Sequence, residues 1–190
     1  REVCKRFAEE GSEVAVFDIN AAGATETVKI IGDAGGKATA HAVDITERAA
    51  VDAAVAEVEK GGPINVLVNN AGWDVPRLFL ESDATLWKKV IDINLYGPLN
   101  MHHAVLPGMV RNGGGRVVNI SSDAGRVGSS GEAVYSACKG GIIAFTKTVA
   151  RELARKGIQL NAVAPGPTDT PLFAEFSKGE GGEKIAEGLK

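Results

Sequence analysis

The sequence predicts an α/β fold built on a doubly wound parallel sheet, and three observations lead to this class. Short apolar runs rich in β-branched residues alternate with longer amphipathic stretches of helical period. The predicted strands are apolar on both faces, as is typical of parallel strands covered by helices on each side. The 190 residues include 24 glycines, about 13% against an average near 7%, and these fall between the apolar runs, where tight turns are needed.

The predicted elements follow in order along the chain. An amphipathic helical pattern opens it, with Val3, Cys4, Phe7 and Ala8 on one face. Strands are expected at Glu13–Asp18 and at residues 37–44, 64–69, 116–121 and 159–163. Helices are expected between them, at residues 21–34, 46–61, 83–112 and 133–156. Each helix connects two strands, as parallel pairing requires.

Composition and charge indicate one globular domain over residues 1–190. Hydrophobic residues make up 44% and charged residues 24%, which excludes a disordered chain. The net charge of -3, without a long run of either sign, argues against nucleic acid or an anionic membrane as a partner. The two cysteines lie far apart, which fits a reducing cytoplasm, and no apolar run approaches the ~18 residues of a spanning helix.

Polar and glycine-rich residues follow the predicted strands, at the edge where doubly wound sheets bind ligands. They are Asp18, Asp44, Asn69-Asn70-Ala71-Gly72, Ser121-Ser122 and Ala164-Pro165-Gly166. A carboxylate in the position of Asp18 accepts hydrogen bonds from the ribose hydroxyls of adenosine and repels a 2′-phosphate. Because no Arg or Lys lies between Ile19 and Thr27, Asp18 indicates NAD rather than NADP. A turn residue or helix cap is the alternative role for this side chain.

Tyr135 and Lys139 lie four residues apart, which places them side by side on one face of a predicted helix. A free phenol has a pKa near 10, and a nearby cation favours the phenolate. Lys139 would therefore tune Tyr135 as a proton donor and acceptor. This spacing alone also occurs on ordinary exposed helices, so the pair gains its meaning from its surroundings.

Four further motifs accompany the pair in a fixed order: Asn69–Gly72, Asn94, Ser122 and Pro165-Gly166. With them, the sequence resembles the short-chain dehydrogenase/reductase family over essentially its whole length. The resemblance implies a Rossmann-like fold and an enzyme that transfers a hydride between a nicotinamide cofactor and a secondary alcohol or ketone. It also implies a homo-oligomer, a tetramer or a dimer, with the two longest helices at an interface.

The resemblance further implies a role for each matching residue. Tyr135 would be the acid/base, Lys139 would lower its pKa and bind the nicotinamide ribose, and Ser122 would hold the substrate oxygen. Asn94 would lie at a kink of the long helix, and its backbone would hold a water that links Lys139 to solvent as a proton relay. The alternative is a mid-helix polar residue that bonds to a neighbouring strand. The implied cofactor-binding residues are Asp18, Ile19, Asp44, Ile45, Asn70, Ala71, Gly72, Tyr135, Lys139, Pro165, Gly166, Thr168 and Thr170.

Other polar residues are expected to be structural. Asn69 would tie neighbouring strands together, and Ser121 is one residue too early for the family's spacing. His102 and His103 are adjacent on a helix, so they point about 100° apart and cannot both bind one metal; no metal site is expected. Cys138 is expected to pack in the core.

The sequence departs from the family at both ends. The Gly-rich phosphate loop with its preceding first strand, and a final strand, do not occur in it, so a chain truncated at both ends is expected. In the family's strand order the first strand is central, and without it two strand edges inside the sheet would be unpaired.

The substrate is expected to contact residues 73–75, residues 126–132 and the segment from Pro171 onward. Similarity to one branch of the family implies an NAD-dependent oxidation of a hydroxyacyl-CoA, in the degradation of aromatic compounds. An NADPH-dependent 3-oxoacyl-carrier-protein reductase remains an alternative, as does a non-catalytic member acting in oligomer contacts.

Overall fold

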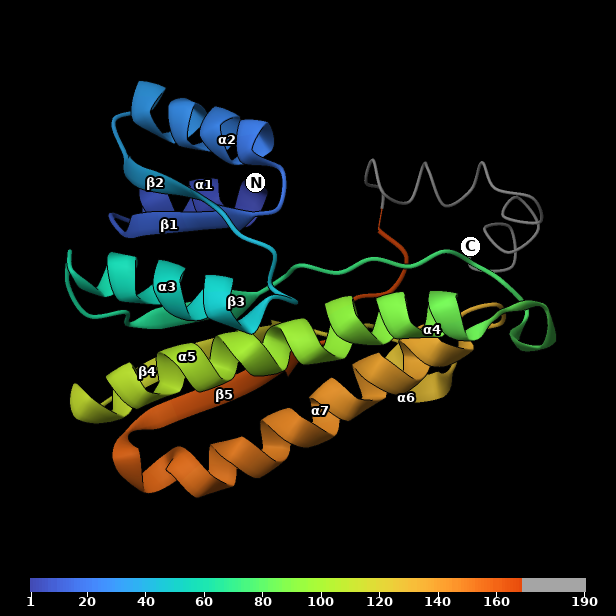
Figure 1. The fold of residues 1–190 in the computed structure, drawn as a ribbon. Coiled ribbons are helices and arrows are strands. Elements are labelled where there is room, and N and C mark those ends of the chain that lie inside the picture. The colour runs from blue at the N-terminus through green and yellow to red at the C-terminus, as the bar shows by residue number, and fades with distance from the viewer. Residues whose placement is uncertain (169–190) are drawn as a thin grey trace. The chain divides into compact units, whose positions relative to one another are not determined.

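The computed structural model describes residues 1–168, and the predicted site residue Thr170 and the segment from Pro171 lie outside them. Parallel strands alternate with helices (Figure 1), so the predicted α/β class is confirmed. Contacts within the chain define two units, Arg1–Gly62 and Pro63–Lys190, which are described in turn. None of the described helices is long and apolar enough to cross a membrane.

The first unit is a two-stranded parallel ribbon covered by helices. Strand β1 (Glu13–Asp18) pairs with β2 (Lys37–Ala42), and α1 (Glu2–Glu9) and α2 (Ala21–Asp33) pack on the ribbon before α3 (Arg48–Glu59) follows. Val16, Ile31 and Val43 are buried in this unit. Strand β2 ends two residues earlier than predicted, because Asp44 accepts hydrogen bonds within the turn that leads to α3.

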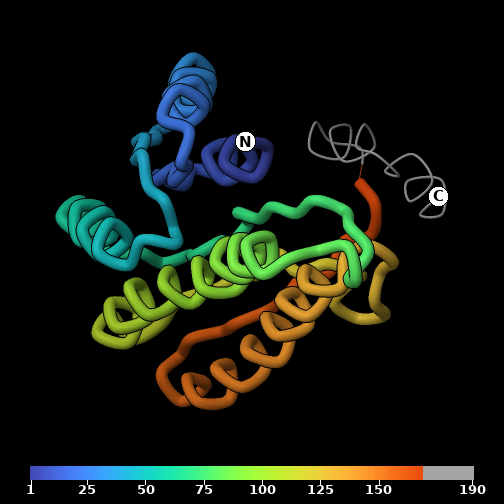
Figure 2. The backbone as a smooth tube through the Cα atoms, turned by 45° about the vertical axis from the view of Figure 1, so that its right-hand side comes forward, coloured from blue at the N-terminus to red at the C-terminus, as the bar shows by residue number. Residues whose placement is uncertain are grey.

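The second unit is a three-stranded parallel sheet in the order β3-β4-β5. Its strands are β3 (Val66–Asn69), β4 (Gly115–Ile120) and β5 (Ile158–Val163). Helix α5 (Gly97–Arg111) packs on β3 and β4, and α7 (Ala133–Leu153) packs on β5. The shorter helices α4 (Ala84–Ile91) and α6 (Ala124–Val127) pack against α7. Between β3 and α4 the backbone runs extended up to the short turn η1 (Phe79–Glu81), as Figure 2 shows.

Strands β1 and β3 do not pair with each other, so the described strands form two sheets. Within each sheet, neighbouring strands are parallel and pair in a continuous register.

The long helical stretch expected over residues 83–112 is interrupted around Asn94, where the family resemblance implied a kink. A π-helical turn, η2 (Asp92–Tyr96), separates α4 from α5. Pro98 has no N–H group, so the carbonyl of Asn94 cannot receive the usual α-helical hydrogen bond. The side chain of Asn94 meanwhile donates to the carbonyl of Val90 over 2.9 Å. These two residues explain why the helix widens here.

A buried chain of amides and hydroxyls joins the sheet of the second unit to its helices. Asn69 Nδ2 donates to Asn119 Oδ1 over 2.9 Å, which confirms the strand-tying role predicted for Asn69. Asn119 Nδ2 donates to Thr146 Oγ1 over 2.8 Å, and Thr146 in turn donates to the carbonyl of Ile142. His102 of α5 packs its ring edge-on against Phe145 of α7, at 4.8 Å between centroids. Both helices therefore lie on the same face of the sheet.

Replacing Asn119 with alanine should destabilise the protein by about 2 to 4 kcal/mol, because it leaves buried partners unpaired and opens a cavity. Asn119 is fully buried and bonds to both Asn69 and Thr146. The midpoint of urea unfolding measures the effect. Asn161→Ala, at an exposed position on β5, is the control and should change the midpoint little. An equal loss in both variants would contradict this account.

Candidate active site

Three of the four predicted catalytic side chains come together where β4 ends and α7 begins. Ser122 follows β4, and Tyr135 and Lys139 lie on the first turns of α7. The Ser122 hydroxyl lies near enough to the Tyr135 phenol to lower its pKa by hydrogen bonding, and Lys139 Nζ lies 5.4 Å from the centre of the Tyr135 ring. A hydroxyl, a phenol and an ammonium thus occupy one location, which is a set that can hold and move a proton.

Close backbone contacts hold α7 against the end of β4. Ser121 Oγ donates to the carbonyl of Lys139 over 2.8 Å, in line with the structural role expected for Ser121. A Cβ atom on Gly125 would lie 2.6 Å from the carbonyl carbon of Lys139 and 2.7 Å from the nitrogen of Gly140. Only glycine therefore allows α6 to approach α7 this closely. The contact also accounts for Gly140, whose own Cβ would lie 3.1 Å from the carbonyl oxygen of Gly125.

Burial controls the ionisation of both Tyr135 and Lys139. Lys139 is only 4% exposed, its Nζ donates to the carbonyl of Ile120 over 3.0 Å, and burial lowers its pKa to about 8. Burial raises the pKa of Tyr135, and its hydrogen bond with Ser122 acts in the opposite direction. The pKa of Tyr135 is raised overall, with burial the largest cause. The lowering of this pKa by Lys139 stays a prediction.

Asn94, the fourth predicted catalytic residue, is fully buried in η2 and holds the segment after β3. Its Oδ1 accepts from the backbone nitrogen of Trp73 over 3.3 Å, and its Nδ2 donates to the carbonyl of Trp73 over 2.6 Å. A Cβ on Gly72 would lie 3.0 Å from Asn94 Oδ1 and 3.4 Å from Lys139 Nζ. Glycine at position 72 therefore lets the backbone pass close to both side chains.

The predicted cofactor residues of the second unit lie in exposed backbone after two strands. Asn70, Ala71 and Gly72 are exposed after β3. After β5, Pro165 and Gly166 are exposed, and the carbonyl of Pro165 accepts from the nitrogen of Asp123 over 2.8 Å. The Thr168 hydroxyl donates to the carbonyl of Gly166 over 3.0 Å. Both segments leave backbone groups open to a ligand.

The predicted cofactor residues of the first unit follow its two strands. Asp18 is exposed at the end of β1, and one of its oxygens accepts from the nitrogen of Asn20 over 2.9 Å. The cap of α2 is Asn20 itself, which accepts from the nitrogen of Gly23, so Asp18 is not the cap. Its bond to the nitrogen of Asn20 is that of a turn residue, the other alternative role named for Asp18. Ile19 is 72% exposed. Asp44 accepts from both the nitrogen and the hydroxyl of Thr46, and Ile45 lies between them.

The remaining candidates have structural partners. The Nδ1 atom of His102 lies 2.6 Å from the carbonyl oxygen of Pro98, and burial lowers the pKa of this histidine. Cys138 is 3% exposed, and burial raises the pKa of its thiol to about 11, as suits core packing. Within residues 1–168, no three side chains of His, Cys, Asp or Glu gather as metal ligands would.

The sequence placed Asp74 and Glu132 in the substrate segments but did not predict that they meet beside Tyr135. The three residues line one small cavity, of about 20 Å³. Burial raises the pKa of Asp74 to about 7 and also raises the pKa of Glu132. The two carboxyls are far apart in sequence, so no spacing pattern could have identified the pair.

Parallel strands with helical crossovers, and a Ser-Tyr-Lys set at the end of a strand, define an oxidoreductase of the doubly wound α/β class. The chain belongs to the short-chain dehydrogenase/reductase family, since a family profile described as short chain dehydrogenase matches residues 1–181. It is accordingly an oxidoreductase acting on CH–OH donors.

Known proteins are similar to this chain over most of its length. The 3-oxoacyl-acyl-carrier-protein reductase FabG of Thermotoga maritima is 39% identical over 167 residues, covering 87% of this chain and 68% of the relative. A human (3R)-3-hydroxyacyl-CoA dehydrogenase is 37% identical over 182 residues, covering 90% of this chain and 70% of the relative. The crystal structure of a variant actinorhodin polyketide ketoreductase with NADPH has a TM-score of 0.90 at 38% identity, covering 93% of this chain and 69% of that one.

Proposed function

We propose that this protein is an NAD-dependent dehydrogenase that interconverts a secondary alcohol and a ketone on a hydroxyacyl-CoA. The observation that carries the proposal is the meeting of Ser122, Tyr135 and Lys139 at the end of β4. The name of the human relative supports an acyl-CoA substrate. Sequence stretches such as Ala71–Asp74 and Met101–Met109 resemble 2-hydroxycyclohexanecarboxyl-CoA dehydrogenase. We therefore propose 2-hydroxycyclohexanecarboxyl-CoA, a cyclic thioester from the degradation of aromatic compounds, as the particular substrate.

In alcohol oxidation, the Tyr135 phenolate would take the proton of the substrate hydroxyl, while Ser122 donates a hydrogen bond to the same oxygen. The buried ammonium of Lys139 would stabilise the phenolate across the 5.4 Å that separates it from the ring centre. The carbonyl of Asn94, which Pro98 leaves without an α-helical donor, would hold a water that carries the proton onward. In ketone reduction the same groups act in reverse.

The residues present fit a nicotinamide dinucleotide, which when bound supplies the hydride acceptor. The hydrogen bond recorded for Lys139 Nζ within residues 1–168 goes to Ile120, which leaves N–H groups for the hydroxyls of a ribose. A side chain on Gly72 would approach that ammonium, so glycine keeps the space above it open. We assign the nicotinamide end to the backbone around Pro165–Thr168, and the adenosine end to Asp18, Ile19, Asp44, Ile45 and Asn70.

Replacing Asp18 with alanine should reduce the preference for NAD over NADP by about tenfold or more, because the change removes a charge that repels a 2′-phosphate. The ratio of kcat/KM for the two cofactors measures the effect. Glu13→Ala is the matched control, an exposed carboxylate at the opposite end of β1, and should leave the ratio unchanged. An unaltered ratio in Asp18→Ala would remove Asp18 from the adenosine site.

The activity itself is tested by following NADH formation at 340 nm with a panel of cyclic and linear hydroxyacyl-CoA thioesters. We expect turnover with NAD and a preference for cyclic substrates. If a folded protein that binds NAD turned over none of these thioesters, the proposed substrate class would be rejected.

We also propose that the protein is a homo-oligomer located in the cytoplasm. Light scattering tests the oligomeric state, and cell fractionation tests the location.

An NADPH-dependent 3-oxoacyl-carrier-protein reductase is the second candidate. It is supported by the similarity to the Thermotoga maritima reductase and to the ketoreductase whose structure contains NADPH. The exposed carboxylate of Asp18 argues for NAD instead. Faster reduction of a 3-oxoacyl carrier protein with NADPH than of any acyl-CoA would favour this second function.

A further inference from the structure

The cavity beside Tyr135 contains two carboxyl groups that the proposed mechanism does not use. Asp74, from the segment after β3, and Glu132, directly before α7, line it together with the phenol. Its volume of about 20 Å³ can hold about one water molecule. Among the described residues, Oδ2 of Asp74 is buried without a hydrogen-bond partner, so this oxygen is left to a proton or a water.

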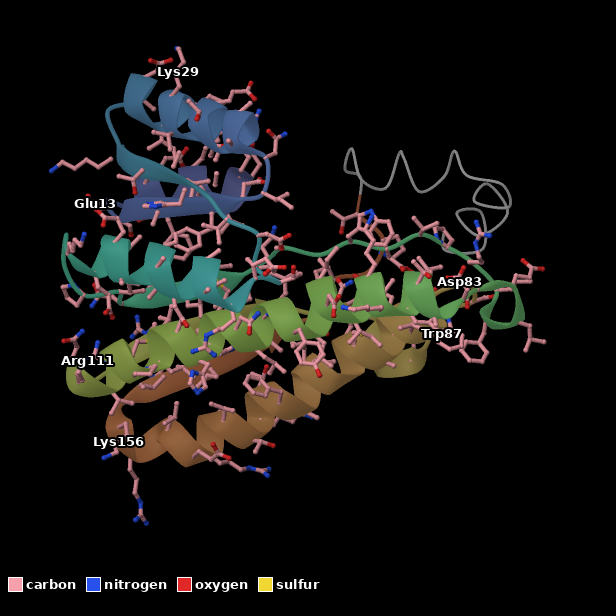
Figure 3. The ribbon with its side chains drawn as sticks, viewed as in Figure 1. Glu13, Lys29, Asp83, Trp87, Arg111 and Lys156 are labelled. Carbon is pink, nitrogen blue, oxygen red and sulfur yellow. The ribbon has the colours of Figure 1, made fainter. Side chains whose placement is uncertain are left out.

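The surrounding packing keeps Asp74 in place. Asn94 holds both backbone polar groups of the preceding residue, Trp73. Trp87 of α4, which also lines the cavity, stacks on Phe79 with 5.2 Å between the ring centroids and donates to the Ser82 hydroxyl over 2.7 Å. Asp83 caps the same helix end by accepting from the nitrogen of Leu86, and Figure 3 marks Asp83 and Trp87 there. Asn94 therefore fixes the backbone directly before Asp74.

The charges near Tyr135 act in opposite directions. The titratable and charged groups around it are Asp74, Arg77, Lys89, Glu132, Cys138 and Lys139. The carboxylates of Glu132 and Asp74 both raise the pKa of Tyr135, and Glu132 also raises the pKa of Asp74. Lys89 Nζ lies over the Trp73 ring at 3.7 Å from its centre. The carboxyls thus oppose ionisation of the phenol.

We propose that Asp74 and Glu132 are positioning residues that act through Tyr135, holding the proton on its phenol and extending the pH range in which Tyr135 can donate it. The inference rests on the proposed role of Tyr135 as the acid/base. When the pH rises and Asp74 loses its proton, the new negative charge makes ionisation of the phenol harder. Ketone reduction, which needs the protonated phenol, would therefore persist to higher pH, and alcohol oxidation would begin at higher pH.

The chain has only two tyrosines, Tyr96 and Tyr135, which allows a direct test. In a Tyr96→Phe background labelled with 3-fluorotyrosine, the single fluorine signal reports the ionisation of residue 135 by ¹⁹F NMR, and the fluorine atom lowers the pKa of the phenol into a more accessible range. We expect Asp74→Asn and Glu132→Gln each to lower the midpoint by about 0.5 to 1 pH unit. Glu81→Gln, an exposed carboxyl outside the cavity, is the control and should leave it in place.

The titration needs no substrate, so it gives an answer even if the proposed function fails. With a thioester that the enzyme oxidises, the rising limb of the pH profile of kcat/KM should move to lower pH by the same amount in both variants. Unchanged midpoints in folded Asp74→Asn and Glu132→Gln would overturn the proposal, as would a shift in only one of them. If either variant does not fold, the serine variant of that position should shift the midpoint in the same way. An equal shift of the midpoint in Glu81→Gln would also overturn the proposal.

Discussion

Replacing Tyr135 with phenylalanine is expected to reduce turnover by a factor of about 10² to 10⁴ or more, while the protein stays folded. The change removes a single oxygen atom, the one that would exchange a proton with the substrate. The ring remains on the first turn of α7 with its packing intact. kcat is measured by NADH formation, and the melting temperature by circular dichroism.

The melting temperature of Tyr135→Phe should remain near that of the parent, because the phenol is half-buried and the change removes only its hydrogen bond with Ser122. Tyr96→Phe is the matched control, since this second tyrosine is 55% exposed, and it should retain full activity. Activity retained in Tyr135→Phe would refute the proposed mechanism. Activity lost equally in both variants would point to a general effect of tyrosine replacement.

Local patterns were sufficient for most of the fold. The short apolar run at Glu13–Asp18 forms β1 with the predicted bounds, and the helical period from Ala133 forms α7. Tyr135 and Lys139 could be paired from their spacing, because four residues make one helical turn. Their link to Ser122 could be inferred only through the family resemblance, since it depends on how α7 meets β4.

Features created by contacts between distant segments could not be predicted. The π-helical turn η2 depends on Pro98 and on the hydrogen bond of Asn94 to Val90, which helical period does not reveal; only the family resemblance implied a kink at Asn94. The raised pKa of Tyr135 likewise follows from burial, which a four-residue spacing does not contain. Helical period also could not find the four-residue helix α6, which Gly125 allows to pack against α7.

Lys139→Met is expected to lower kcat by about 100-fold or more without weakening the fold at neutral pH. Methionine retains the buried stem but removes the ammonium that would stabilise the phenolate. Burial lowers the pKa of Lys139 from 10.5 to about 8, so keeping it charged costs the folded state about 3 kcal/mol below pH 8. The variant avoids that cost and loses the hydrogen bond to Ile120, so its unfolding free energy at pH 7 should not be lower.

The pH dependence of stability separates this electrostatic effect from simple loss of packing. Between pH 8 and 10.5 the unfolded chain keeps the Lys139 proton that the folded chain has released, so unfolding becomes harder as the pH rises. The buried Cys138 and Tyr135, whose pKa values are raised, act in the opposite direction, but they are present in both proteins. The parent should therefore gain stability relative to Lys139→Met across this range, measured by urea unfolding at each pH. Lys147→Met, at an exposed position on α7, is the control and should show no such difference from the parent. If the unfolding free energies of the parent and Lys139→Met changed in parallel with pH, Lys139 would not be buried as a charge.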